Sequence, residues 1–198
     1  KFGFGQKTNI DLTSEVSGNI ENLLKDKVKD IDFATASFGQ GIAVTPIQMI
    51  ASYAALANKG VLMKPYIVDE IIDNENNVVS KTEPQVVRQV VSEQTAETVS
   101  AMLVNVVEHG HAKKSQVAGY YVGGKTGTAQ IPSPRGGYLE NQYIHNFIGY
   151  APISDPKFVL LVKFDNPKTS IYAEGTVVPV FGEIVDFLLK YYQVPKER

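Results

Sequence analysis

The sequence predicts an α+β fold in which helices cover an antiparallel sheet. Two amphipathic helix patterns, with a hairpin pattern between them, precede three strand-like segments and a last helix. A short link containing Asp155-Pro156 joins the second and third strand segments, and such a link favours antiparallel neighbours. This order of elements differs from the regular alternation of strands and helices in a parallel βαβ sheet.

The composition limits the classes of protein to which the chain can belong. Its 198 residues fit one domain or part of one, and 43% hydrophobic and 20% charged residues are ordinary for a folded protein. The net charge of −2 gives no electrostatic reason to expect nucleic acid as a partner. Because the chain has no cysteine, disulfides, zinc–thiolate sites and cysteine nucleophiles are excluded.

The first helix is predicted to begin at Pro46. Thr45 can cap it, and proline fits the first helical position because an N–H would have no helical partner there. Asn58-Lys59-Gly60 ends it. Between these limits, apolar residues recur at helical spacing at Ile47, Ile50, Ala51 and Ala54.

Two further helices are predicted. Ser92 caps the second, which stops at Gly110, and the last runs from about Val180 to Tyr192. Both carry an apolar stripe at helical spacing. Residues 1–33, by contrast, are predicted to form a glycine-rich opening and a polar loop from Asn22 to Asp32.

Residues 61–91 are predicted to form a small β-hairpin subregion. Its strands are Tyr66–Ile72 and Asn77–Ser80, because a polar run at residues 73–76 separates two β-branched segments.

The main sheet is predicted within residues 120–164. Its strands are Tyr120–Thr128, Ile144–Tyr150 and Phe158–Phe164. Between the first two, Ile131–Gln142 is rich in proline and glycine and is expected to be a mobile loop.

The motif that carries chemistry is Lys125-Thr126-Gly127-Thr128, on the first strand of this sheet. Thr126 and Thr128 alternate, so both side chains project to one face, where their hydroxyls can donate to one carboxylate. Lys125 adds positive charge nearby. Gly127 has no side chain, so a ligand can lie against the backbone as an added strand. The N–H of Thr128 can help to stabilise an oxyanion.

A Lys-Thr-Gly triplet occurs together with Ser-x-x-Lys and Ser-x-Asn motifs in β-lactamases and penicillin-binding proteins. Ser154-Asp155-Pro156-Lys157 fits the first pattern, but its proline favours a turn over a helix start. Ser17-Gly18-Asn19 fits the second, but no serine nucleophile precedes it. We therefore predict that neither is catalytic. His109 and His111 lack supporting carboxylate or cysteine ligands, so no metal or other cofactor is expected.

The segments around the motif resemble class B penicillin-binding proteins, which are monofunctional peptidoglycan D,D-transpeptidases. These segments are Phe2–Gly5, Ile10–Leu12, Phe38–Gly41, Val44–Met49, Tyr53–Gly60, Met102–Glu108, Ala118–Gln130 and Phe147–Pro152. Together they run along almost the whole chain and are most similar to the division or elongation type. Gly110-His111-Ala112 departs from the Gly-Thr-Ala that is usual in the family.

The resemblance implies that residues 1–198 are the C-terminal portion of a single transpeptidase domain with the penicillin-binding or serine β-lactamase-like fold. The chain opens on Lys1 without a signal-peptide pattern, so we expect the remaining strands, the nucleophile helix and any membrane anchor upstream. The edge of strand Phe158–Phe164 would then be unpaired. We therefore expect the chain to require its missing half or to self-associate.

The resemblance also implies a function for the parent protein, namely peptidoglycan cross-linking through a serine acyl-enzyme at the extracytoplasmic face of the cytoplasmic membrane. Its ligands would be stem peptides ending in D-Ala-D-Ala and β-lactams, and its partners other cell-wall synthesis proteins. Lys125, Thr126, Gly127 and Thr128 would bind the substrate carboxylate, with Gln130 as a further contact. The chain alone is predicted to be inactive. A β-lactamase or D,D-carboxypeptidase, and a non-catalytic binding module of this fold, remain alternatives.

Overall fold

The computed structural model describes all 198 residues. The α-helices are α1 (Asp30–Ser37), α2 (Pro46–Ala57), α3 (Glu93–Glu108) and α4 (Val177–Tyr191). The strands are β1 (Val61–Met63), β2 (Glu70–Ile72), β3 (Val78–Lys81), β4 (Val86–Gln89), β5 (Gly123–Pro132), β6 (Tyr138–Ala151) and β7 (Phe158–Asp165). Three 3-10 turns are η1 (Glu21–Leu23), η2 (Lys113–Ser115) and η3 (Ala173–Gly175). None of the helices has the length and apolar composition needed to cross a membrane.

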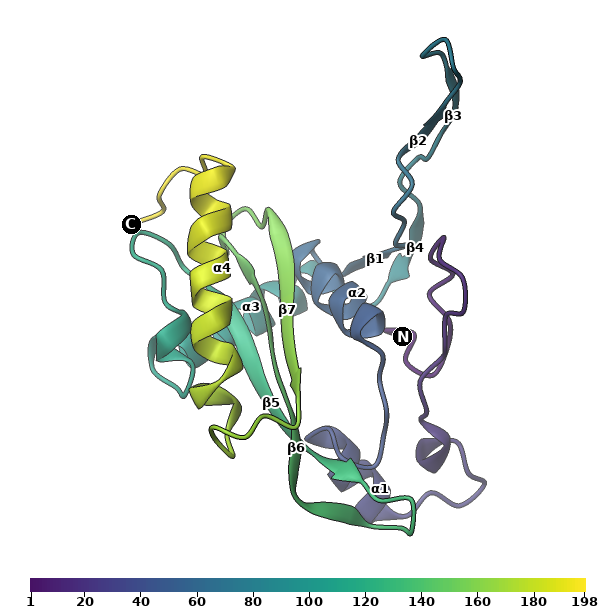
Figure 1. Cartoon of the computed structure of the whole chain (residues 1–198), viewed down its shortest axis with the longest axis vertical. Helices are drawn as coiled ribbons and strands as arrows, with labels where there is room; N and C mark the ends of the chain where they lie inside the picture. The colour runs from purple at the N-terminus through teal and green to yellow at the C-terminus, as the bar shows by residue number, and fades with distance from the viewer.

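The main sheet has the order β5-β6-β7, and all its pairs are antiparallel. Helix α4 packs on one face, whereas α2 and α3 lie on the other (Figure 1). Alternate residues of β6 contact the two layers. The Phe147 ring lies 4.5 Å from the Phe181 ring of α4, and the Tyr150 hydroxyl lies 2.6 Å from that of Ser100 in α3. This arrangement confirms the predicted α+β fold class.

The largest core lies between the sheet and α4. Phe147, Phe181, Val185 and Leu189 are completely buried there. Each large apolar side chain that is withdrawn from water stabilises the fold by about 1.5–3 kcal/mol. Since β6 is fixed by this core, β5 is held along one side by a rigid neighbour and its other side forms the edge of the sheet.

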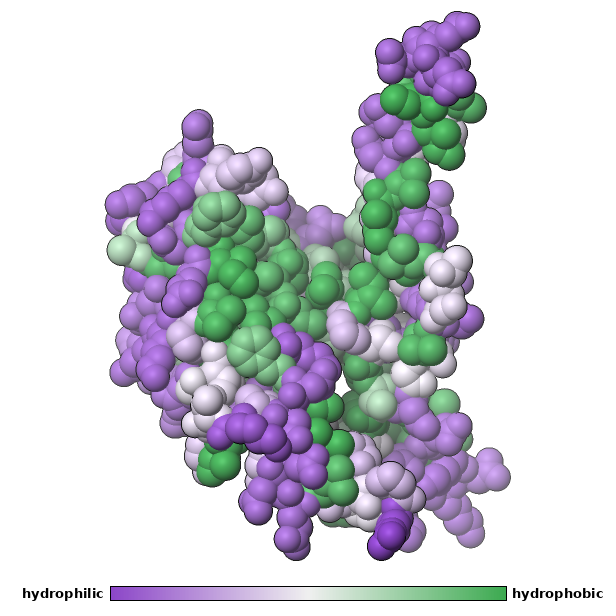
Figure 2. All heavy atoms as spheres, viewed as in Figure 1, coloured by the Kyte–Doolittle hydropathy of each residue, from purple (hydrophilic) through white to green (hydrophobic).

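Residues 61–91 form two antiparallel sheets of two strands each. Strands β1 and β4 pair next to α2, and β2 and β3 continue beyond them as an arm that projects from the body (Figure 1). Every residue of β2 and β3 is exposed, and apolar side chains gather along the arm (Figure 2). The predicted hairpin is present, although its first strand begins at Glu70 and not at Tyr66.

Two local predictions are wrong. The expected mobile loop at Ile131–Gln142 is mostly strand, because Pro132 pairs with Tyr138 and the turn is confined to residues 133–137. Pro132 ends an edge strand, where its missing N–H interrupts no ladder. The expected polar loop reaching Asp32 contains the start of α1. The apolar residues of that helix are not gathered on one face, so it has no apolar stripe by which its sequence could be recognised.

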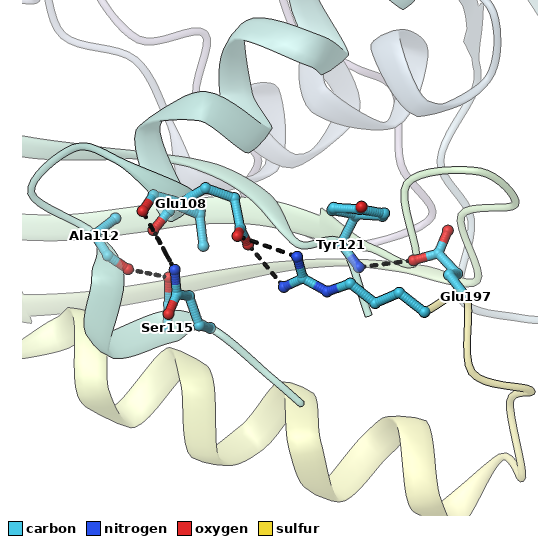
Figure 3. Close-up of polar contacts among 8 residues, drawn as sticks. Glu108, Ala112, Ser115, Tyr121 and Glu197 are labelled. Atoms are coloured by element: carbon cyan, nitrogen blue, oxygen red, sulfur yellow. Dashed lines mark hydrogen bonds and ion pairs between the residues drawn. The ribbon is translucent and has the colours of Figure 1, made fainter. Parts of the chain in front are cut away.

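The C-terminal tail joins α3 to the segment that leads into β5 (Figure 3). The Arg198 guanidinium binds the Glu108 carboxylate and lies over the Tyr121 ring. The Glu197 carboxylate accepts hydrogen bonds from the N–H groups of Tyr121 and Ser154. The tail thus fixes both the entry to β5 and the β6–β7 turn.

Candidate substrate-binding strand

The Lys-Thr-Gly-Thr motif lies on β5, at an edge of the main sheet (Figure 1). Thr126 is paired with Phe147 and Thr128 with His145, so both threonines lie on the α4 face. Lys125 is paired with Ile148 and lies on the opposite face. The alternation of the side chains agrees with that expected from the sequence, although the strand spans Gly123–Pro132 and not the predicted Tyr120–Thr128.

Both threonine hydroxyl oxygens accept a hydrogen bond. The Ala173 N–H of η3 donates to Thr128 Oγ1 at 3.2 Å. The Lys125 ammonium bends across the strand edge and donates to Thr126 Oγ1 at 3.3 Å and to the Thr126 carbonyl at 3.0 Å. Because each hydroxyl oxygen accepts from an N–H donor, each hydroxyl proton remains free to be donated to a ligand.

Gly127 is constrained by its neighbour on β6. A Cβ at this position would lie 2.5 Å from Asn146 Oδ1 and 2.7 Å from Asn146 Nδ2. Asn146 is paired directly with Gly127. A methyl group at this position would therefore require the Asn146 side chain to move, besides limiting the ligand access expected from the sequence.

Gln130 is exposed and lies opposite Tyr143, near the hairpin end of β5. Its side chain is on the face of Thr126 and Thr128. The Gln130 side chain makes no hydrogen bond in the structure, so only the alternation of side chains along β5 places it on the same face as the two threonines.

Two groups near the motif were missed by sequence reasoning. The Ala173 N–H comes from a turn 45 residues after Thr128, and a backbone donor leaves no mark in the sequence. His145 is fully buried beside Thr128, with both ring nitrogens hydrogen-bonded. His145 and Phe147 are two residues apart in the predicted strand, so their side chains lie on the same face. This spacing was the signal in the sequence that His145 faces the core.

The two serine patterns that fit Ser-x-x-Lys and Ser-x-Asn have structural roles. Ser154 lies in the turn before β7, and its hydroxyl and N–H bind the Glu197 carboxylate. The Ser17 carbonyl accepts a hydrogen bond from Gln48, and Asn19 pairs with Ala43. Neither serine begins a helix. The Nδ1 atom of the exposed His111 lies 3.6 Å from Oε2 of Glu174.

Residues 1–186 match the family model described as "Penicillin binding protein transpeptidase domain". The chain belongs to this family. Among curated relatives, stage V sporulation protein D of Bacillus subtilis is 46% identical over 93% of this chain and 28% of its own length. Peptidoglycan D,D-transpeptidase FtsI of Escherichia coli is 35% identical over 96% of this chain and 30% of its own length. The transpeptidase-domain chain thus spans about a third of these relatives.

Solved structures agree with this assignment. The crystal structure of penicillin-binding protein 3 from Mycobacterium tuberculosis in its apo form matches with a TM-score of 0.89 and 32% identity. The match covers 100% of this chain and 46% of that one. The same protein complexed with aztreonam matches with a TM-score of 0.88 and 32% identity, over the same shares of the two chains. The α+β fold is therefore that of part of a class B penicillin-binding transpeptidase domain.

Proposed function

We propose that the chain is the C-terminal portion of the transpeptidase domain of a peptidoglycan D,D-transpeptidase, and that β5 binds the carboxylate of the acyl donor. One observation carries the proposal. Thr126 and Thr128 lie at an open sheet edge, and an N–H donor occupies the oxygen of each hydroxyl, so both protons are available to an anion. The Lys125 ammonium next to them supplies the opposite charge.

The same edge suits an oxyanion. In an antiparallel edge strand, every second residue turns its N–H and C=O away from the partner. The Thr126 carbonyl accepts a hydrogen bond from the Lys125 ammonium, which is consistent with a carbonyl that points away from β6. Thr128 lies two residues further along the strand, so its N–H and C=O point in the same direction as those of Thr126. The Thr128 N–H can therefore donate to the oxyanion of a reacting amide. Gln130, two residues beyond Thr128, is a further contact for an extended peptide.

The reaction that this strand would serve is acyl transfer from a stem peptide. A serine Oγ attacks the carbonyl of the penultimate D-alanine, the peptide C–N bond breaks, and terminal D-alanine leaves with the serine's proton. The amine of a neighbouring peptide then attacks the ester and releases the serine. β-Lactams, which carry a carboxylate and a reactive amide, would occupy the same site.

The serine is proposed to lie outside this chain. Ser154, whose sequence pattern fits a nucleophile, is engaged by Glu197 in a turn. The relatives are about three times longer than their matched part, which leaves room for a nucleophile and a membrane anchor upstream. The chain alone is therefore proposed to be inactive, and the parent protein to act at the extracytoplasmic face of the membrane with other cell-wall synthesis proteins.

Fluorescent penicillin labelling tests the proposal in the longer protein that contains this chain. Hydrogen bonds to charged groups contribute about 1.5–3 kcal/mol, so Thr126→Val and Thr128→Val should each slow acylation roughly 10- to 100-fold. Thr98→Val, on the exposed surface of α3, is the matched control and should label normally. Unchanged labelling of both motif variants would refute carboxylate binding by β5.

Two alternatives give different results. A β-lactamase would turn over penicillin and release the label, whereas a transpeptidase should retain a stable adduct. A D,D-carboxypeptidase would instead be recognised because it passes the acyl group of a D-Ala-D-Ala peptide to water and forms no cross-link. A non-catalytic module would take no label. The curated relatives named above favour the transpeptidase, because the Escherichia coli protein is named a peptidoglycan D,D-transpeptidase.

A further inference from the structure

His145 is a buried polar residue directly behind the proposed carboxylate site. It is completely buried on β6 and paired with Thr128. A buried imidazole has to satisfy both ring nitrogens, and His145 does so through one segment of chain. Nδ1 lies 2.8 Å from Thr176 Oγ1, and Nε2 lies 3.1 Å from the Ile171 carbonyl oxygen.

These partners determine the state of the ring. A carbonyl only accepts, so Nε2 carries the proton and donates it to Ile171. Nδ1 of the neutral ring then accepts from the Thr176 hydroxyl. Burial lowers the pKa of His145 below its usual range, and the hydrogen bond to Ile171 opposes this only in part. The neutral ring thus acts as a donor to one end of the 171–176 turn and an acceptor from the other.

The turn that His145 bridges carries the donor to Thr128. Ala173 is buried between Ile171 and Thr176, and its N–H donates to Thr128 Oγ1 at 3.2 Å. The Thr176 hydroxyl also lies 3.3 Å from the Ala173 carbonyl. The Ala173 N–H thus lies between the two residues that contact His145, Ile171 and Thr176.

We propose that His145 is a positioning residue for ligand binding: through the 171–176 turn it holds the Ala173 N–H on Thr128 and so directs the Thr128 hydroxyl proton toward the acyl donor's carboxylate. This inference rests on the proposed function of β5. It assigns to the buried histidine a role in orienting a group that the histidine itself does not touch.

A double-mutant cycle tests the coupling, with penicillin acylation rates measured in the longer protein that contains this chain. His145→Phe keeps an aromatic ring but removes both nitrogens, and it should slow acylation roughly 3- to 10-fold, the value of a typical hydrogen bond. His145→Phe added to Thr128→Val should cause no further loss, because the hydroxyl that His145 positions is already absent. His111→Phe, at an exposed histidine, should leave the rate unchanged.

Thr176 provides a second, milder test that does not alter the buried ring. Thr176→Val removes the hydroxyl that donates to His145 and should slow acylation, whereas Thr176→Ser retains it and should restore the rate. Melting temperatures of all variants show whether a loss arises from unfolding. If His145→Phe unfolds the protein, Thr176→Val takes its place in the double-mutant cycle with Thr128→Val.

The possible outcomes are distinct. If Thr128→Val slows acylation and the effects of His145→Phe and Thr128→Val multiply, His145 acts independently of Thr128 and the inference is wrong, while the proposed function stands. The inference on His145 is also wrong, and the proposed function again stands, if Thr128→Val slows acylation but the His145 and Thr176 variants acylate at the normal rate. If Thr128→Val has no effect while Thr126→Val slows acylation, the role of His145 is refuted and carboxylate binding by β5 stands. If neither threonine variant has an effect, both proposals are refuted.

Discussion

The guanidinium of Arg198 binds the carboxylate of Glu108 through two hydrogen bonds, of 3.1 and 2.9 Å, across 90 residues of sequence. The same guanidinium lies 4.3 Å from the centre of the Tyr121 ring. A planar guanidinium can make both contacts at once because its edge meets the carboxylate while its face covers the ring. The last residue of the chain therefore links the end of α3 to the approach to β5 (Figure 3).

Arg198→Ala should lower the free energy of unfolding by about 1 kcal/mol, since the pair is partly shielded from solvent and bidentate. Arg198→Lys should recover part of this loss, because an ammonium keeps the charge but not the paired geometry. Urea unfolding measures the change. Arg135→Ala, in the exposed turn between β5 and β6, is the control. Equal effects of Arg198→Ala and Arg135→Ala would show that the contact does not stabilise the fold.

Gly127→Ala should reduce penicillin acylation, either because the new methyl group overlaps the Asn146 side chain or because it blocks the approach of the ligand. If cross-strand packing is the reason for glycine, Asn146→Ala should restore the rate in the double variant by removing the overlapping atoms. If ligand access is the reason, the double variant should be as slow as Gly127→Ala alone. Acylation rates of the two single variants and the double variant decide between these explanations.

Local signals account for the parts of the fold that the sequence predicted well. Thr45 accepts a hydrogen bond from the Gln48 N–H and Ser92 from that of Thr95, so both predicted caps are confirmed. The last helix begins at Val177, three residues before the predicted start. Its first turn has no side-chain cap, which is why its start carried no local signal.

The parts that were missed depend on contacts between distant residues. The partners of His145 lie 26 and 31 residues further along the chain, and the donor to Thr128 lies 45 residues away. Such contacts exist only after the sheet and α4 have packed. The sequence could therefore place Lys125, Thr126 and Thr128 on one strand, but it could not show which groups orient their side chains.

Tyr53 provides a prediction for alkaline pH. Burial raises the pKa of its phenol to about 12, and the nearby Tyr150 phenol acts in the same direction. The folded-state pKa lies above the unfolded value of about 10, so this contribution to stability is complete below pH 10 and is lost as the pH rises toward 12. Tyr53→Phe should make stability fall less steeply above pH 10 and remove one late-ionising phenol from an ultraviolet titration. An unchanged titration would contradict the assignment.

The outer edge of β7 provides the last prediction. This strand pairs with β6 alone, and large apolar side chains are exposed near it and on α4, including Phe164, Phe187 and Tyr191. Unpaired strand edges template association, particularly when apolar groups flank them. The isolated chain should therefore self-associate with increasing concentration and bind a dye specific for apolar surfaces. Sedimentation velocity measures the first property and fluorescence the second.

A lysine on this edge should oppose strand pairing, because a charge cannot be buried there without a partner. Phe164→Lys should shift the isolated chain toward the monomer, whereas Gln130→Lys, on the opposite edge of the sheet, should not. Equal shifts from both substitutions would mean that net charge, and not the β7 edge, controls association. A wild-type chain that stays monomeric, unfolds in a single transition and binds no dye would show that the β7 edge needs no partner.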